Sequence, residues 1–311
     1  AWLGNIDDWR AAGWTLVERA LERPLLTGLV LVIFCALAWF ARRLFARLNT
    51  IAQAVGRYST DNYWRTPEAL VISGLLALRS PILFGYAGWL LSQPPQTSEF
   101  TAGVGNGLLM VALLVTFLRF IQYVCVEKGL FSTHFGWAER AREVLWKNVL
   151  WLKYMLIPVA FLLGMIHVSS AQYLRDGLGR LAFLAGGIAV SAFFWRILHP
   201  RRGILAERLV PGNAIWMTRY LWYALLILTP LAISGLALRG YYDGASQIQA
   251  GLILTVAIIF AAFIAYNVVM RQVLVTRRRL EIRRAYERRE KARAQLAAQE
   301  ASEASGEAKT I

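Results

Sequence analysis

Seven long apolar runs divide this chain, and none of its 19 acidic residues lies in the middle of one of them. About 20 helical residues, rising 1.5 Å each, are needed to cross the hydrocarbon core of a bilayer. The runs therefore predict an all-α membrane protein with seven transmembrane helices. We place these helices at residues 24–41, 67–91, 104–126, 148–168, 178–198, 216–238 and 249–275.

Basic residues gather on one side of this arrangement. Of the 34 Lys and Arg residues, 26 lie in alternate loops or in the C-terminal tail, and six lie on the opposite side. Because basic loops stay in the cytoplasm, we expect a periplasmic N-terminus and a cytoplasmic C-terminus. The formal net charge of +15 then belongs to the membrane faces, so no nucleic-acid partner is expected.

Composition divides the chain into four segments. Residues 1–23 repeat apolar residues at three- and four-residue steps, which favours an amphipathic helix in the periplasmic interface over a linker with boundary tryptophans. Residues 24–275 hold the seven spans. Residues 276–299 predict a basic cytoplasmic helix, and residues 300–311 predict a disordered acidic linker.

Three of the predicted spans contain an internal proline, namely Pro81, Pro158 and Pro230. All three spans run toward the periplasm, and the prolines are spaced about 75 residues apart. Proline removes one backbone hydrogen bond and bends a helix, so we expect three hinges. The spacing suggests a repeat of helical hairpins, although proline is also common in membrane helices without any repeat.

Arg79 is the charge nearest to the centre of a predicted span. A centred arginine costs about 2.5–3.5 kcal/mol on insertion scales, so it needs a polar surrounding. We expect Arg79 to face a crevice lined by water or lipid headgroups, with snorkelling to the interface as the alternative. Lys153, the other charge inside a span, lies close enough to the cytoplasmic face to snorkel.

The start of the C-terminal segment is strongly basic. Such a segment is drawn to anionic lipid by about 1 kcal/mol for each basic residue near the surface. We therefore expect an anchor on the inner leaflet formed by Arg271, Arg277, Arg278, Arg279, Arg283 and Arg284.

Reaction chemistry is not indicated. The two cysteines and three histidines share no ligand spacing with Asp or Glu, so no cofactor, metal site or enzymatic activity is expected. His134 falls in a predicted cytoplasmic loop, where a polar role is expected.

Glycines occupy positions 103, 105 and 107. No strand precedes them, as it would in a nucleotide-binding loop, so they instead favour close packing of helices.

Several short motifs occur together in a distinctive order. They are His134-Phe135-Gly136-Trp137, Leu178-Gly179-Arg180-Leu181, Leu198-His199-Pro200, Arg219-Tyr220-Leu221-Trp222-Tyr223, Gly240-Tyr241-Tyr242, and the run from Arg277-Arg278-Arg279-Leu280 to Arg288-Arg289. This ordered set resembles the inner-membrane sensor region of the large bacterial channels of the small-conductance mechanosensitive superfamily, the potassium-dependent and miniconductance types. It departs from their pattern at Asp243-Gly244, where a third aromatic residue is expected.

The resemblance implies a multi-pass protein of the bacterial inner membrane. It implies a lipid-contacting, tension-sensing domain at the periphery of a channel protomer that assembles as a homoheptamer and protects the cell against osmotic stress. No apolar run follows Val275, and the chain begins at Ala1, so we expect a piece of a longer protein that lacks the pore helix and does not conduct alone.

Other functions stay open. A secondary transporter predicts an intramembrane carboxylate or paired broken helices, of which the repeated prolines offer only the second. A membrane enzyme predicts a cluster of His, Asp or metal ligands near one interface. A module that only recruits partners has no sequence signature by which it could be recognised.

Overall fold

The computed structural model describes residues 2–55, 62–93, 98–199, 203–204 and 217–307, and all regular elements within these residues are helical. The first α-helices are α1 (Ile6–Glu22), α2 (Pro24–Ala54), α3 (Arg65–Leu78), α4 (Pro81–Leu91) and α5 (Glu99–Val124). The later elements are α6 (Leu130–Thr133), α7 (Glu139–Val168), α8 (Gln172–Leu174), α9 (Arg180–Ile197), α11 (Arg219–Leu238) and α12 (Tyr242–Glu307). A single 3-10 turn precedes α1, and a π-helical turn (Arg175–Gly179) joins α8 to α9.

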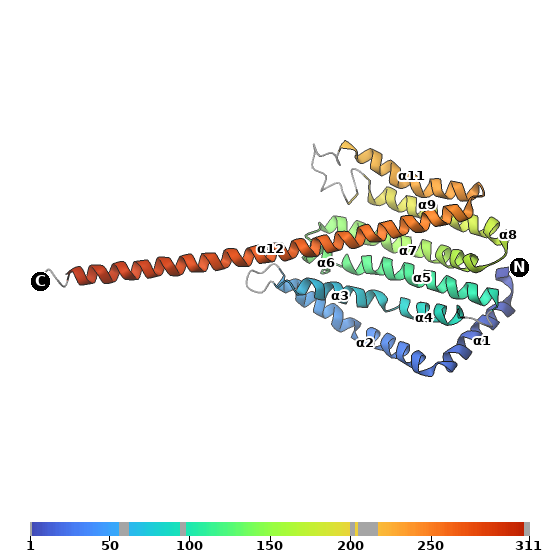
Figure 1. The fold of residues 1–311 in the computed structure, drawn as a ribbon, viewed down its shortest axis with the longest axis horizontal. Coiled ribbons are helices and arrows are strands. Elements are labelled where there is room, and N and C mark those ends of the chain that lie inside the picture. The colour runs from blue at the N-terminus through green and yellow to red at the C-terminus, as the bar shows by residue number, and fades with distance from the viewer. Residues whose placement is uncertain (1, 56–61, 94–97, 200–202, 205–216, 308–311) are drawn as a thin grey trace.

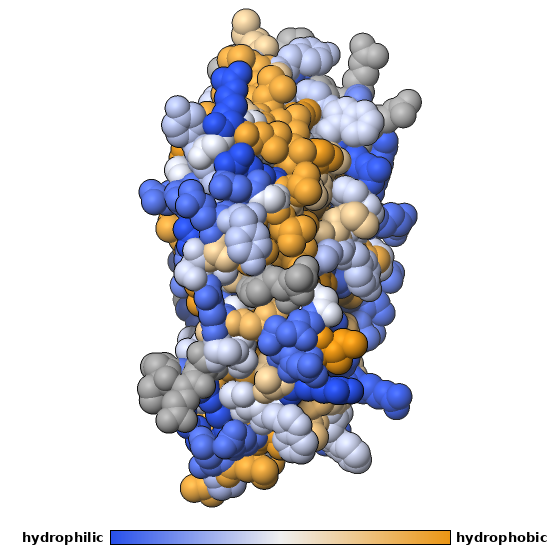
Figure 2. Space-filling view, turned by 90° about the vertical axis from the view of Figure 1, so that its right-hand side faces the viewer, coloured by the Kyte–Doolittle hydropathy of each residue, from blue (hydrophilic) through white to orange (hydrophobic). Residues whose placement is uncertain are grey.

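The long helices lie side by side in chain order. In Figure 1 the row runs from α2 through α3 and α4, α5, α7 and α9 to α11, and each element contacts the next. Helix α12 returns across one face of this row and then projects well beyond it. Figure 2 views the molecule from the end away from the projecting part of α12. The outline is elongated, and hydrophilic and hydrophobic residues are interspersed on this face. The architecture is therefore a layer of helices covered on one face by α12.

Within the part of the chain that the structure describes, six helices are long and apolar enough to cross a membrane. They are α2, α5, α7, the α8–α9 segment, α11 and the apolar part of α12. The prediction of an all-α membrane protein is thus confirmed with about six spans. A seventh span requires α3 and α4 to act together, and these two helices are bent by 54° relative to one another.

Only one of the three predicted hinge prolines coincides with an interruption of a helix. Pro81 begins α4 directly after the break that follows α3. Pro158 and Pro230 lie inside α7 and α11, which continue through them. Each proline removes the same kind of backbone hydrogen bond, so the residues around it decide whether the helix is interrupted.

Helix α12 is longer than the sequence predicts. It runs without interruption from the apolar span through the basic segment to Glu307, so residues 300–307 are helical where a disordered linker was expected. Alanine and glutamate have good helix propensity, and extending an existing helix avoids the cost of nucleation. Residues 308–311 of the expected linker lie outside the described residues, as does residue 216 of the sixth predicted span.

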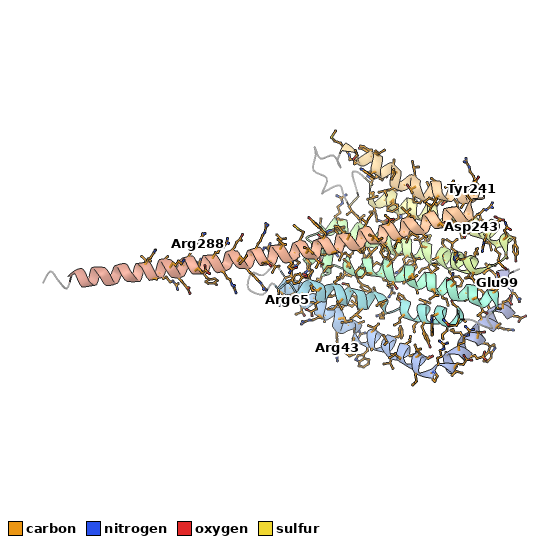
Figure 3. The ribbon with its side chains drawn as sticks, in the orientation of Figure 1. Arg43, Arg65, Glu99, Tyr241, Asp243 and Arg288 are labelled. Carbon is orange, nitrogen blue, oxygen red and sulfur yellow. The ribbon has the colours of Figure 1, made fainter. Side chains whose placement is uncertain are left out.

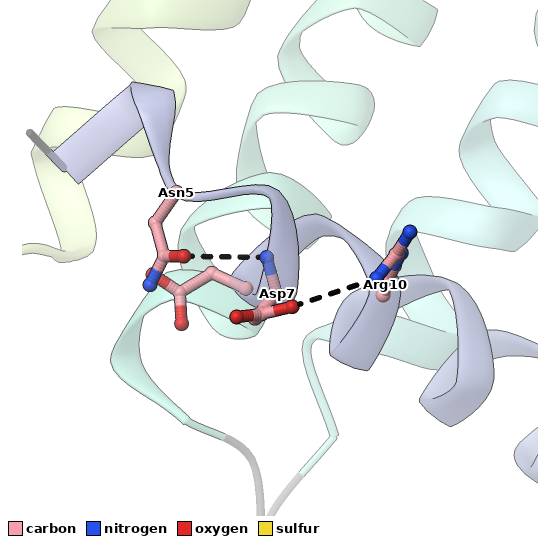
Figure 4. Close-up of polar contacts among 4 residues, drawn as sticks. Asn5, Asp7 and Arg10 are labelled. Carbon is pink, nitrogen blue, oxygen red and sulfur yellow. Dashed lines mark hydrogen bonds and ion pairs between the residues drawn. The ribbon is translucent and has the colours of Figure 1, made fainter.

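Helix α1 begins at a capped turn. The side-chain oxygen of Asn5 accepts the backbone N–H of Asp7 at 3.3 Å, and Asp7 pairs with Arg10 at 3.7 Å (Figure 4). One face of α1 packs on the row of helices, since the ring of Trp9 lies 5.1 Å from that of Phe100 in an edge-on contact. The opposite face exposes apolar side chains, including Trp14. The predicted amphipathic helix is therefore attached to the bundle as well as open to its surroundings.

Glycines bring α4, α5 and α7 close together near the end where α5 begins. A Cβ atom on Gly164 would lie 2.7 Å from the Cα of Gly107, and one on Gly88 would lie 2.7 Å from the carbonyl oxygen of Gly105. The expectation that this glycine-rich start of α5 serves close packing is confirmed. Such contacts are important in a bilayer, because lipid tails are as apolar as the side chains and packing must supply the attraction between helices.

We predict that Gly164→Ala destabilises the protein by about 1–3 kcal/mol, because the added methyl group forces α5 and α7 apart. Thermal unfolding in detergent measures the effect. Gly74→Ala is the matched control, because a Cβ atom there meets nothing within 4 Å. Equal midpoints for the two variants would contradict the close packing at Gly164.

Candidate functional site

Helix α12 contacts the row at both ends of its apolar part: Tyr242 and Ala245 pack against Phe183 at its start, and a second group of contacts lies near the end from which α12 projects. Two rings of α12, Phe260 and Phe263, enter a group of aromatic side chains from α5 and the turn after it. Phe263 lies 6.0 Å from Phe131 and 5.9 Å from Trp137, and Phe260 lies 5.8 Å from Phe117. This aromatic cluster comprises Phe117, Phe120, Phe131, Phe135, Trp137, Phe260 and Phe263.

The turn after α6 (Leu130–Thr133) holds the cluster in place. Trp137 folds back, donating its backbone N–H to the carbonyl oxygen of Phe131 at 2.9 Å, and the two rings stack 4.4 Å apart. The fold-back passes through Gly136, whose φ of 61° lies in the left-handed region. An L side chain there costs about 1–2 kcal/mol, which explains the glycine in the middle of an aromatic motif.

A polar network adjoins the aromatic cluster. The Nε of Arg271, on α12, donates to the hydroxyl of Thr66 on α3 at 2.9 Å, and that hydroxyl lies 3.0 Å from Nδ1 of His134. Arg271 also donates through Nη1 to the backbone oxygen of His134 at 3.4 Å. The Thr66 hydroxyl therefore bonds both Arg271 and His134. Three segments far apart in the sequence are thus joined at one point.

The ring of His134 is buried beside a positive charge. Its Nδ1 shares a hydrogen bond with the Thr66 hydroxyl, and its Nε2 is buried without a hydrogen-bond partner among the described residues. Burial, together with the nearby charge of Arg271, lowers the pKa of His134 to about 3. Protonating His134 would place a second positive charge beside Arg271 and weaken the attachment of α12.

The predicted basic anchor divides into two parts. Arg271 is half-buried in the polar network, whereas the other five arginines are exposed on α12: Arg277, Arg278, Arg279, Arg283 and Arg284. Arg279 reaches back to the helix row and donates to the side-chain oxygen of Asn62 at 3.3 Å. Figure 3 shows Arg65 and Arg288 toward the end from which α12 projects, and Glu99 and Asp243 at the opposite end. Contact of these arginines with anionic lipid stays a prediction.

Arg79 caps α3 at the break before α4. It is half-buried, and no hydrogen bond or ion pair joins it to the described residues. The nearest end of α4 has no side-chain cap either, because Ser80 makes no capping bond. The structure therefore leaves Arg79 without a protein counter-charge, and the lipid or water crevice around it stays a prediction.

The sequence did not indicate the polar network. His134 was expected to be a polar loop residue, but it is 7% exposed and Thr66 is completely buried. Thr66 and Arg271 are separated by 205 residues, so no local spacing connects them. The one available signal was the position of His134 directly before Phe135-Gly136-Trp137, which gives it an apolar neighbourhood. Among the described residues, no three His, Cys, Asp or Glu side chains form a group that could hold a metal ion.

Comparison with known proteins identifies the relatives of this helix row. A family model described as the mechanosensitive ion channel inner membrane domain 1 matches residues 24–311. The chain belongs to this family. Like the family domain, it is a multi-pass protein of the inner membrane.

Three relatives extend the comparison. The chain is 28% identical over 291 residues to the miniconductance mechanosensitive channel MscM of Escherichia coli (strain K12), covering 93% of the chain and 26% of that protein. It is 23% identical over 279 residues to the mechanosensitive channel MscK of the same organism, covering 89% of the chain and 24% of MscK.

An uncharacterized MscS family protein of Haemophilus influenzae is 25% identical over 260 residues, covering 80% of the chain and 22% of that protein. The chain therefore spans about a quarter of the length of these relatives. No solved structure matches it.

We predict that acid weakens the fold of this family member through His134. The folded-state pKa of about 3 lies below the unfolded value of about 6.5, so protons bind preferentially to the unfolded chain between these limits. The histidine's contribution to stability is complete above about pH 6.5. Below that pH it falls by up to about 1.4 kcal/mol per pH unit until the folded-state pKa is reached.

Unfolding free energies in detergent between pH 7.5 and pH 5 measure this effect. The control is His134→Asn, which keeps a polar side chain and removes the titrating group, while His167 and His199 remain in both proteins. The difference in stability between the two proteins should shrink as the pH falls. A difference independent of pH would contradict the neutral buried state of His134.

Proposed function

We propose that the chain is the peripheral, tension-sensing membrane domain of a mechanosensitive channel protomer. The proposal rests on family membership and on the names of the relatives MscM and MscK. The structural observation that carries it is the attachment of α12. This helix is held to the row by the aromatic cluster and the polar network, and it then continues unbroken to Glu307. It provides a mechanical connection from the lipid-facing helices to whatever follows.

Tension can bias a channel only if its states differ in membrane area or in how they deform the bilayer. A row of helices presents a large perimeter to lipid, and tilting the row changes that area. The 54° break between α3 and α4 offers one place for such a change. The remaining prolines, Pro158 and Pro230, are proposed secondary hinges within continuous helices.

In this proposal α3 and α4 count as one span. The domain then has seven transmembrane helices in residues 24–275, with a periplasmic N-terminal helix and a cytoplasmic C-terminal basic helix. The arginines from Arg277 to Arg284 lie at the inner leaflet beside anionic lipid. Protomers assemble as a homo-oligomer, a heptamer by family resemblance. The domain has no catalytic role, and ion efflux passes through a pore module outside these helices.

The one feature shared with a secondary transporter is the broken α3–α4 pair. Transporters of that kind place paired broken helices and ionisable ligands at a midplane site. Among the described residues no other bent pair forms a candidate span, and Glu68, Glu99 and Glu139 each lie in the first turn of their helix. These observations favour the sensor.

We predict that the two ends of α5 lie on opposite sides of the membrane. Cysteines introduced at Ser98 and at Lys128, both exposed, report these ends in a background of Cys35→Ala and Cys125→Ala. In intact cells a membrane-impermeant maleimide should label Ser98→Cys. Lys128→Cys should react only after the inner membrane is permeabilised. Equal labelling of both positions in intact cells would overturn the proposed orientation.

We predict stretch-activated current from the full-length protein in cells that lack other mechanosensitive channels. Patch-clamp recording under graded suction measures its threshold. Phe263→Ala should raise that threshold, because it removes on the order of 2 kcal/mol of contacts that join α12 to the row. Phe84→Ala is the matched control, since Phe84 is exposed on α4. Absence of any stretch-activated current would end the channel proposal, and an unchanged threshold would end the role of α12.

A further inference from the structure

A cluster of basic and amide side chains, Arg119, Gln122 and Lys153, lies between α5 and α7, with Arg119 half-buried. Lys153 of α7 and Gln122 of α5 are each only 8% exposed. The Nζ of Lys153 donates to Oε1 of Gln122 at 3.4 Å. Arg119 lies one turn before Gln122 on the same helix, close enough for its charge to act on Lys153. The expectation that Lys153 snorkels to water is therefore wrong, because most of its side chain is covered by neighbouring residues and its Nζ bonds Gln122.

The hydrogen-bonding needs of this cluster are not met by the protein. Nη1 of Arg119 and Nε2 of Gln122 are both buried without a partner among the described residues. The ion pairs found in the same residues join Arg10 to Asp7, Arg47 to Glu68, Lys147 to Glu143 and Arg180 to Asp176, and none reaches the cluster. Two positive charges thus influence one another, with two unused donors nearby and no ion pair to a carboxylate among the described residues.

Buried donors and like charges are unfavourable unless an acceptor of opposite charge is present. The missing partner must be negative, must accept several hydrogen bonds, and must reach a guanidinium, an ammonium and an amide together. A phosphate group meets these requirements, because its oxygens accept several charge-assisted hydrogen bonds at once. A chloride ion lacks the separate oxygens, and a carboxylate offers only two.

The position of the cluster suits a lipid phosphate. Arg119 lies five residues before the end of α5 at Val124, which corresponds to about 8 Å along the helix axis. In the proposed topology, which puts the end of α5 at the inner leaflet, this depth is near the boundary between headgroups and acyl chains. Tyr154, whose ring lies 4.9 Å from Nζ of Lys153, is 61% exposed. The cluster therefore borders the outer surface of the bundle, where a lipid is adjacent.

We propose that Arg119, Gln122 and Lys153 form a binding site for a phosphate group, supplied by the headgroup of an anionic phospholipid. The guanidinium and the ammonium neutralise the phosphate charge, and Nε2 of Gln122 donates a further hydrogen bond. Lipid bound in this way would tie α5 to α7 at the end where α12 is attached. The site does not depend on the proposed channel function, and binding tests it without any current.

The test uses the full chain in detergent and titrates phosphatidylglycerol or phosphatidylcholine while following the unfolding midpoint. Phosphatidylglycerol should raise the midpoint well above the effect of phosphatidylcholine. Lys153→Met should increase the half-saturating concentration of phosphatidylglycerol by about tenfold or more. Lys128→Met is the matched control, since Lys128 is exposed at the same end of the bundle. An equal response of the wild type and Lys153→Met would overturn the proposal.

A second variant distinguishes loss of the binding site from loss of the fold. Gln122→Glu supplies a carboxylate beside Lys153 and Arg119, so the protein then carries its own counter-charge. We expect a higher midpoint without added lipid and a much reduced response to phosphatidylglycerol. A full response in Gln122→Glu would also overturn the site.

A third arm replaces the lipid with millimolar inorganic phosphate. No shift with free phosphate, together with a shift for phosphatidylglycerol, identifies the lipid as the source. A phosphate shift that Lys153→Met abolishes assigns the same site to a soluble anion. No shift with either compound would overturn the proposal.

Discussion

Helices surrounded by lipid gain little from hiding apolar surface against one another, so specific contacts must hold them together. This constraint explains the uneven construction of the helix row. At the end where α5 begins, glycines such as Gly107 and Gly164 let backbones approach closely. At the end from which α12 projects, aromatic rings and a buried hydrogen-bond network hold the helices together instead. The glycine contacts depend on small residues and leave the helices little freedom to move relative to one another. The contacts of α12 depend on edge-on aromatic rings and on a neutral His134.

Much of the fold could be predicted from the sequence, because the bilayer restricts what an apolar run can become. Segment lengths, basic loops and the close packing at Gly103, Gly105 and Gly107 all follow from local patterns. The behaviour of the prolines did not follow. Pro81 marks a break, whereas Pro158 and Pro230 are accommodated within helices, and composition alone does not distinguish the three. The sequence also did not predict that α12 continues to Glu307. Polar, low-complexity residues are typical of disorder, but here they extend a helix that has already formed.

The site was harder to predict than the fold because its residues are distant in the sequence. Thr66, His134 and Arg271 come from three separate helices or turns, and each has an ordinary explanation when taken singly. Lys153 is a similar case. A lysine near a helix end is expected to reach water, and only the packed structure shows it enclosed beside Gln122. In both places the informative fact is a buried nitrogen, Nε2 of His134 or Nε2 of Gln122, that has no hydrogen-bond partner among the described residues.

The continuity of α12 has a geometric consequence. A helix of 66 residues is about 100 Å long, and the part beyond Val275 accounts for about 48 Å of it. Such a rod is a lever whose fulcrum is the aromatic cluster around Phe260 and Phe263. The 44 residues from Phe263 to Glu307 give an arm of about 66 Å, so a rotation of about 5° at that point moves the far tip sideways by about 6 Å. Small rotations among the spans would therefore displace the distal arginines of α12 by much more than the spans themselves move.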